Sequence, residues 1–168
     1  MATLYSKAKI LGHPIHPMLV AFPIAGYVTT LVAFVVYAIT RDIVWFRVGF
    51  WANVVGVIAA VVAAIPGLID WAFGIPKHST AKRVGLLHMA LNLGVTALFA
   101  INLLIQAPRM DAIAPPAASA VVLSLIGVAG LLASGYLGWS LVQTYHVGVQ
   151  LSRDQQRFEP RERIETSP

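Results

Sequence analysis

The sequence contains no cysteine and few charged residues. The absence of cysteine from 168 residues excludes disulfides, thiolate chemistry, cysteine-ligated zinc and cysteine-bound iron–sulfur clusters. Charged residues make up 11% of the chain and apolar residues 58%, with a mean hydropathy of +0.75, whereas soluble domains are about 25% charged. A chain of this length cannot bury so much apolar surface in a water-soluble core, so lipid must cover part of it.

Motifs of nucleotide-binding proteins and hydrolases are also absent. The sequence holds no Walker-type loop, no G-x-G-x-x-G and no nucleophile elbow. The formal net charge of +5 would suggest nucleic acid as the partner of a soluble protein. Here the basic residues flank apolar runs, so phospholipid headgroups explain them and no nucleic-acid partner is expected.

The chain instead has four long apolar runs. They predict helices over Met18–Thr40, Val48–Phe73, Val84–Ile105 and Ala117–Val142. Each run is near or above the roughly 20 residues that a helix needs to cross a bilayer. Short connections favour antiparallel neighbours, so we predict an all-α, integral membrane four-helix up-down bundle over residues 18–146. A strap over residues 1–17 and a flexible tail over residues 147–168 would flank it on the same side.

Basic residues divide unequally between the two ends of this bundle. Nine lie at the end that carries both termini: Lys7, Lys9, Lys77, Lys82, Arg83, Arg153, Arg157, Arg161 and Arg163. Three lie at the other end: Arg41, Arg47 and Arg109. Because an excess of lysine and arginine marks the cytoplasmic side, we expect both termini in the cytoplasm.

Small residues recur every fourth position in two of the runs. They are Ala52, Gly56, Ala60 and Ala64 in the second run, and Gly130, Ser134 and Gly138 in the fourth. Such ladders let helix backbones approach closely in lipid. Packing within one chain is the simpler interpretation, and a homo-oligomer seam is the alternative left open. Asn53 and Asn102 are expected to make interhelical hydrogen bonds.

All five histidines fall at the end that carries the termini. They are His13 and His16 before the first run, His78 after the second, His88 inside the third and His146 at the end of the fourth. Asp70 joins them near the end of the second run. An ionisable group inside a membrane helix is costly and usually faces the bundle interior with a partner. We therefore expect a site centred on His88, with Asn92 four residues further along the same helix face.

The motif Gly12-His13-Pro14-Ile15-His16-Pro17 favours a stiff entry into the first helix. A residue before proline is driven toward extended or polyproline conformation, and both His13 and His16 precede a proline. In a polyproline segment these two histidines would share one edge, roughly 9 Å apart.

Two functions fit this set of polar residues. Neutral imidazole ligates both haem iron and transition metals. The first hypothesis is a redox or electron-transfer accessory subunit that binds haem b or a divalent transition metal. Its ligands would come from His16, His88, His13 and His146, with Asp70 and Asn92 orienting the rings, and a metal ion would take three histidines with Asp70. The alternative is a non-enzymatic structural subunit whose histidines form a hydrogen-bonded plug without a cofactor. No catalytic residue is predicted.

The doubled His-Pro motif, followed by Phe22-Pro23-Ile24, resembles a family of small bacterial and archaeal membrane proteins of unknown function. Further matching segments are Gly67–Trp71, Leu87-His88 with Asn92, and Tyr145–Val149. The resemblance covers about residues 10–149 and implies a four-span bundle in the bacterial inner membrane. Some members of this family are joined to Rieske-type iron–sulfur domains, which implies electron transfer. This chain has no cysteine, so such a domain would belong to a separate redox partner protein.

Overall fold

The computed structural model describes residues 6–149 together with residues 152, 154 and 157. In that part of the chain, four helical segments are long and apolar enough to cross a membrane. They are α1 (Ile15–Leu19) with α2 (Ala21–Thr40), α3 (Ile43–Ile69) with the π-helical turn η1 (Asp70–Gly74), α4 (Thr80–Gln106) with the 3-10 turn η2 (Ala107–Arg109), and α5 (Ala118–Gln143). The predicted all-α membrane bundle is confirmed. Most of the predicted tail lies outside the described residues.

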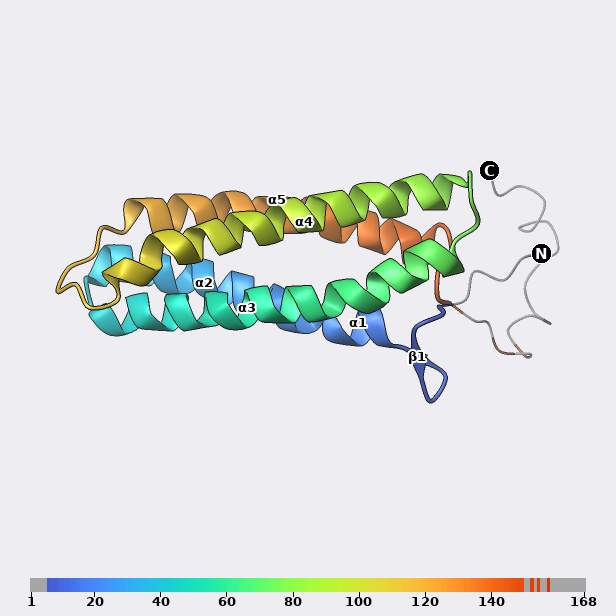
Figure 1. Cartoon of the computed structure of the whole chain (residues 1–168), viewed down its shortest axis with the longest axis horizontal. Coiled ribbons are helices and arrows are strands. Elements are labelled where there is room, and N and C mark those ends of the chain that lie inside the picture. The colour runs from blue at the N-terminus through green and yellow to red at the C-terminus, as the bar shows by residue number, and fades with distance from the viewer. Residues whose placement is uncertain (1–5, 150–151, 153, 155–156, 158–168) are drawn as a thin grey trace.

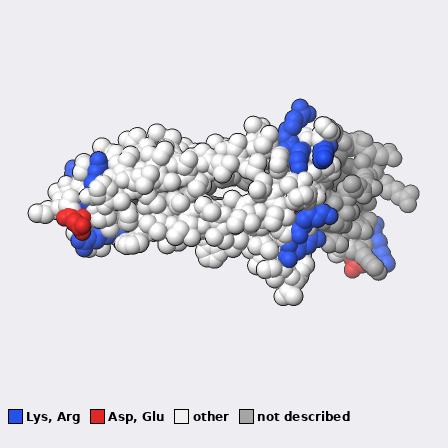
Figure 2. All heavy atoms as spheres, viewed as in Figure 1, with Lys and Arg blue, Asp and Glu red and all other residues white. Residues whose placement is uncertain are grey.

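The helices α2, α3, α4 and α5 follow one another around the bundle, and α5 packs back against α2 (Figure 1). The most extensive contacts are within the hairpins α2–α3 and α4–α5. We call the end with α1, η1 and the last turn of α5 the histidine end, and the opposite end the loop end. Lysine and arginine gather at these two ends, and the surface between them is free of charge on the face shown (Figure 2). Such an apolar middle is expected of helices that face lipid.

The second crossing begins earlier than the sequence predicts. The apolar run suggested a connection over Arg41–Arg47, but only Arg41 and Asp42 separate α2 from α3. Arg41 takes a left-handed φ of 60° and its N–H bonds back to α2, while the Asp42 carboxylate accepts from Val44 N–H at 3.0 Å and caps α3. A drop in hydropathy marks where a helix leaves the apolar region, which need not be where the helix begins. Arg47, which the hydropathy placed in the connection, therefore lies inside α3.

Glycine brings α2 and α3 into backbone contact. A Cβ at Gly26 would lie 2.7 Å from the Cα of Gly56, closer than real side-chain carbons come to backbone atoms. The ring of Tyr27 packs against Gly56, because a Cβ at Gly56 would lie 2.8 Å from Tyr27 Cδ1. On the other hairpin, a Cβ at Gly130 would meet Val95 Cγ2 at 2.8 Å. The small-residue ladders therefore pack within the chain at these positions, and a homo-oligomer seam stays a prediction.

Buried amide side chains link the helices, as predicted for Asn53 and Asn102. Asn53 Nδ2 donates to the carbonyl of Phe99 on α4 at 3.1 Å. Asn102 Nδ2 donates to Ala120 O and Ser124 Oγ on α5, at 3.2 and 3.0 Å. Both asparagines are fully buried. No water competes for these groups in hydrocarbon, so each bond fixes the relative position of two helices.

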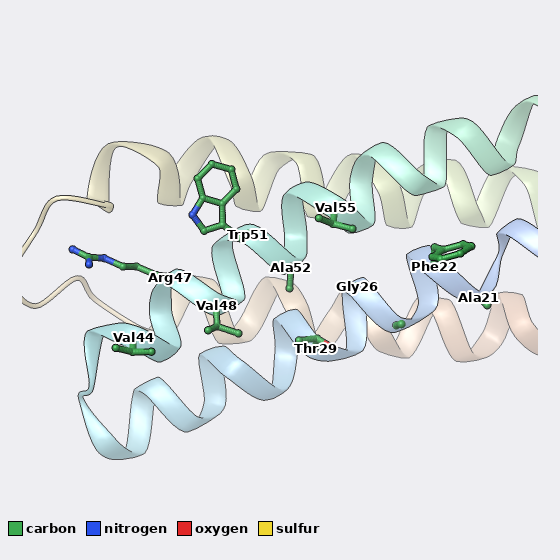
Figure 3. A pocket seen from close by; sticks show the side chains of 11 residues that line it. Ala21, Phe22, Gly26, Thr29, Val44, Arg47, Val48, Trp51, Ala52 and Val55 are labelled. Carbon is green, nitrogen blue, oxygen red and sulfur yellow. The ribbon is translucent and has the colours of Figure 1, made fainter.

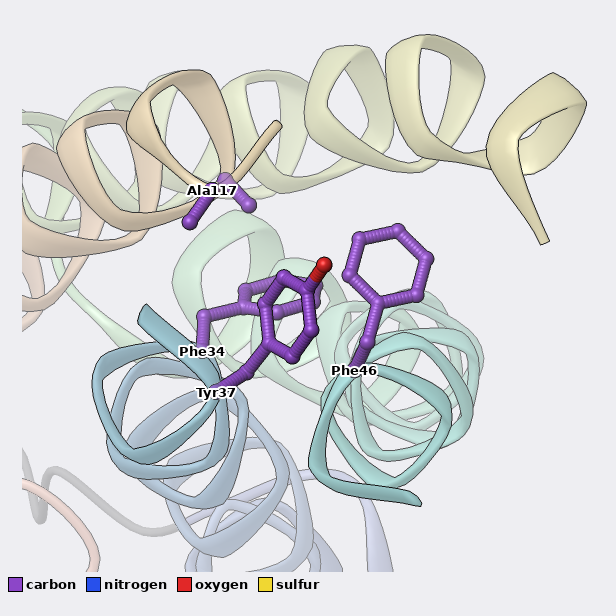
Figure 4. Close-up of a cluster of buried hydrophobic side chains, with 5 residues drawn as sticks. Phe34, Tyr37, Phe46 and Ala117 are labelled. Atoms are coloured by element: carbon purple, nitrogen blue, oxygen red, sulfur yellow. The ribbon is translucent and has the colours of Figure 1, made fainter. Parts of the chain in front are cut away.

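Aromatic side chains fill the loop end of the bundle. Phe34 and Tyr37 of α2 pack against Phe46 of α3, with ring centroids 5.6 and 5.2 Å from that of Phe46, and Ala117 completes the cluster (Figure 4). The Tyr37 hydroxyl donates to Pro115 O at 2.7 Å, which ties α2 to the chain before α5. The loop end is therefore a packed core, and the histidines lie at the other end.

Gly26→Ala tests the backbone contact between α2 and α3. The added Cβ would force the helices apart, and overpacking costs about 1–3 kcal/mol, so we expect a lower melting temperature in detergent by circular dichroism. Gly94→Ala is the matched control, because a Cβ there meets nothing within 4 Å and alanine favours a helix by about 1 kcal/mol. Equal melting temperatures for the two variants would contradict the close approach.

Candidate functional site

A β-hairpin and one short helix form the strap ahead of α2. Strand β1 (Lys9–Ile10) pairs with β2 (His13–Pro14). The two-residue turn between them has positive φ at both Leu11 and Gly12, 49° and 82°, as a type I′ turn requires. His13 is exposed, and its Nδ1 donates to Leu11 O at 3.0 Å. The first histidine of the motif is thus held by its own turn.

The predicted polyproline geometry is wrong for the second histidine of the motif. His16 lies in α1, directly before Pro17, which stands in the first turn of that helix. Proline is tolerated there because the first N–H groups of a helix have no intrahelical acceptor. His13 and His16 therefore belong to different elements, and the shared polyproline edge does not form.

Asp70 fixes the strap to the end of α3. Its two carboxylate oxygens accept from Ser6 Oγ at 2.9 and 2.8 Å, and one of them also accepts from the N–H groups of Lys7 and Ala8 at 2.6 and 2.9 Å. Ala8 O then accepts from the N–H of Ile15, the first residue of α1, at 3.0 Å. These contacts connect Asp70 to the start of α1 by way of the strap. Asp70 therefore helps to position His16 without touching it.

His16 reaches from α1 to α3. Its Nδ1 donates to Ala63 O at 2.8 Å. A Cβ at Gly67 would lie 2.8 Å from that same nitrogen, so only glycine leaves room for the ring. Its Nε2 has no hydrogen-bond partner in the described part of the chain and is not fully buried.

His88 makes the equivalent contact between α4 and α5. Its Nδ1 lies 2.9 Å from Ser134 O and 3.0 Å from Ser134 Oγ. A Cβ at Gly138 would lie 3.1 Å from the Cε1 atom of the ring. Each half-buried histidine thus occupies a notch opposite a glycine and donates to a carbonyl of the helix that carries that glycine.

Asn92 contacts the His88 ring, as the spacing of four residues predicts. Its Nδ2 lies 3.2 Å from His88 Nε2, 3.4 Å from His88 Nδ1 and 2.5 Å from Ser134 Oγ. A donor in line with the Nε2 lone pair would be much farther from Nδ1 than from Nε2. The similar distances therefore place the amide beside the ring and not in line with the Nε2 lone pair.

His16 and His88 lie next to each other. Their ring centroids are 6.4 Å apart and the ring planes are close to perpendicular, at 87°. A carbonyl oxygen only accepts, so in each neutral ring Nδ1 carries the proton and Nε2 keeps a lone pair. The two residues are far apart in sequence, and the even number of crossings between them brings them to the same end, as predicted from the topology.

The remaining histidines are exposed. His78 lies in the loop before α4 and His146 in the turn after α5, both with left-handed φ, 64° and 52°. In the part of the chain that the structure describes, no group of three or more histidine, aspartate or glutamate side chains is placed to hold a metal ion. Of the predicted histidine ligands, His16 and His88 are the two that ring contact brings together in the described part of the chain.

Comparison with known families decides where this fold belongs. The profile of the family described as "Predicted membrane protein (DUF2231)" matches residues 12–151. The chain belongs to this family. The matched region of this DUF2231 protein begins at Gly12, the first residue of the doubled His-Pro motif, and extends past α5, so it contains both members of the histidine pair. No curated protein and no solved structure matches the chain.

Sequence reasoning about this DUF2231 protein missed the partners of the two rings. Ala63 and Ser134 act through backbone carbonyls, which the sequence does not distinguish from any others. Gly67 and Gly138 make the notches for the two rings. In the sequence, Gly138 stands out only as a member of a packing ladder. A glycine at the depth of a histidine on the neighbouring helix is the signal that would have found them.

His88→Ala tests how strongly the ring ties α4 to α5. The change leaves the Ser134 carbonyl and hydroxyl without the imidazole and opens the glycine notch. An unmade bond to a buried polar group costs about 1–3 kcal/mol, so we expect a melting temperature in detergent several degrees below that of the wild type. The exposed His78→Ala is the matched control, and a His88→Ala variant as stable as that control would rule out the tie.

Proposed function

We propose that this four-span membrane protein is a redox accessory subunit in which His16 and His88 bind haem b. The observation that carries the proposal is the pair itself. Two half-buried imidazoles from separate hairpins lie 6.4 Å apart, each held through Nδ1 by a carbonyl of a neighbouring helix.

The number of ligands favours haem over a bare metal ion. Structural zinc takes four protein ligands and catalytic zinc three, and the described residues offer no such group. Haem iron is already held by the porphyrin and takes its axial ligands from the protein. His16 and His88, whose ring centroids lie 6.4 Å apart, would be the two residues that hold such a group.

The surrounding residues hold the two rings in the state that such a ligand needs. The Ala63 and Ser134 carbonyls accept from Nδ1, so Nε2 would be the ligating atom and its basicity is raised. Asn92 restrains the His88 ring from the side. Bound haem would supply one-electron transfer at this end of the bundle, and a separate partner protein would supply or accept the electron.

A structural accessory subunit is the second candidate. The observation that favours it is that both Nδ1 bonds join two helices, His16 to α3 and His88 to α5. In this function the histidines lock the bundle and Nε2 is bound only by water. It predicts a protein that holds no cofactor but still loses stability when His88 is removed.

An absorption spectrum separates the two functions. We expect protein expressed with ample haem and purified in mild detergent to show the Soret band of a haem protein, because His16 and His88 would hold the group. His16→Ala and His88→Ala should each lose or shift that band, and the exposed His78→Ala should keep it. A colourless wild-type protein would refute the haem function, and a loss of stability in His88→Ala would then leave the structural one.

We also infer that the histidine end faces the cytoplasm and that the membrane is the bacterial inner membrane. The support is the excess of lysine and arginine at that end, nine against three over the whole sequence. Arg153, Arg161 and Arg163 of that set lie outside the described residues. A cytoplasmic site would take its electrons from, or pass them to, a partner on that side.

Single cysteines test this orientation, because the chain has none of its own. Leu11 at the histidine end and Ile113 at the loop end are almost fully exposed, at 94% and 97%. We expect a membrane-impermeant maleimide to label Ile113→Cys in intact spheroplasts, and Leu11→Cys only after the membrane is opened. The reverse pattern would place the histidine pair on the outer side.

A further inference from the structure

A long apolar groove runs along the outside of the α2–α3 hairpin. It has a volume of about 840 Å³ and is lined by alternating turns of the two helices, among them Phe22, Gly26, Val48, Trp51 and Ala52 (Figure 3). Gly26 and Ala52 line its floor and leave no large side chain to fill the space. Phe22 and Trp51 are 61% and 60% exposed, with Phe22 toward the histidine end of the groove and Trp51 partway along α3.

On α3 the lining residues run from Val44 to Val55, and at 1.5 Å per residue this is roughly 16 Å. On α2 the lining continues past that level toward the histidine end, because Gly26 lies against Gly56 and Phe22 stands one turn before Gly26. The groove is therefore longer than half of the hydrocarbon core of a bilayer, which is about 15 Å. The groove lies on helices that cross the membrane, so the medium that reaches it is lipid, and a chain of methylene groups is the shape it admits.

One cation stands at the end of this otherwise apolar groove. Arg47 lines it one turn from Trp51, and its side chain extends from α3 toward the loop end (Figure 3). It has neither a hydrogen bond nor an ion pair in the described part of the chain, although Arg109 at the same end is bonded to Gln106 and Ser119. A guanidinium at headgroup depth is a strong partner for a phosphate.

We propose that the α2–α3 groove is a binding site for one phospholipid with a net negative headgroup. The phosphate pairs with Arg47, Trp51 lies at the level of the glycerol backbone, and one acyl chain lies in the groove over Gly26 and Ala52 as far as Phe22. The charge of Arg47 selects the anionic headgroup, since a zwitterionic lipid brings its own cation to compete with it. The site is separate from the histidine pair.

Fluorescence of Trp51 reports on the proposed lipid directly. Replacing Trp45, Trp71 and Trp139 by phenylalanine leaves Trp51 as the only tryptophan, and the protein is reconstituted in phosphatidylcholine vesicles. Brominated phosphatidylglycerol or brominated phosphatidylcholine is then titrated in as the quencher. We expect a roughly fivefold preference for the anionic lipid at Trp51, the size of one basic residue near an anionic headgroup.

Two variants and one control locate the interaction. Arg47→Gln should remove the preference, and Ala25→Leu, which adds bulk to the groove from an exposed position, should weaken quenching by both lipids. Arg41→Gln is the matched control, because Arg41 is exposed at the same end but does not line the groove. All variants are compared only when their circular dichroism matches that of the parent.

Two outcomes would overturn the proposal. Equal quenching by the two lipids, unchanged in Arg47→Gln, would mean that ordinary boundary lipid covers the groove. If neither lipid quenches Trp51 and light scattering shows a dimer, a second copy of the chain covers the groove.

Discussion

The hydrogen bond from a half-buried imidazole to a backbone carbonyl of the neighbouring helix is the interaction on which the histidine end depends. It occurs twice, from His16 to Ala63 and from His88 to Ser134. A helical carbonyl already accepts from its own helix, so a second donor must come in from the side, and the ring fits there only where a glycine removes the side chain. The same bond joins two helices and selects the tautomer, which couples bundle packing to the chemistry available at Nε2.

The two ends of the bundle use polar groups in opposite ways. At the loop end, Gln106 Nε2 donates to Asn102 Oδ1 and Arg109 donates to Gln106 Oε1, so the amides satisfy one another inside a packed core. At the histidine end, the Nε2 of His16 has no partner in the described chain. Within the described residues, polar side chains at the loop end satisfy one another, whereas the histidine end keeps a ring nitrogen without a hydrogen-bond partner.

The topology and the central pair follow from the sequence, and the reason is geometric. Four apolar runs with short connections fold the chain back an even number of times, so His16 and His88 must come to the same end, and the helix period puts Asn92 beside His88. Their exact partners do not follow, because backbone carbonyls carry no sequence signal. The polyproline geometry predicted for the strap is wrong. Proline disfavours a helical conformation in the residue before it, but Pro17 lies in the first turn of a helix, where an N–H group would have no intrahelical acceptor. The role of Asp70 also escaped prediction, because its donors are the backbone of Lys7 and Ala8 and the hydroxyl of Ser6.

A lock and a ligand site make different demands on the same histidine. A lock needs one donor, and serine or asparagine can supply it in a membrane helix at lower desolvation cost, as Asn53 and Asn102 do elsewhere in this bundle. Imidazole adds a second nitrogen whose lone pair the lock does not use, and a neutral imidazole nitrogen is a common metal ligand. Two such rings lie side by side, each with Nδ1 donated to a carbonyl and each set against a glycine, and the proposed ligand role rests on this arrangement.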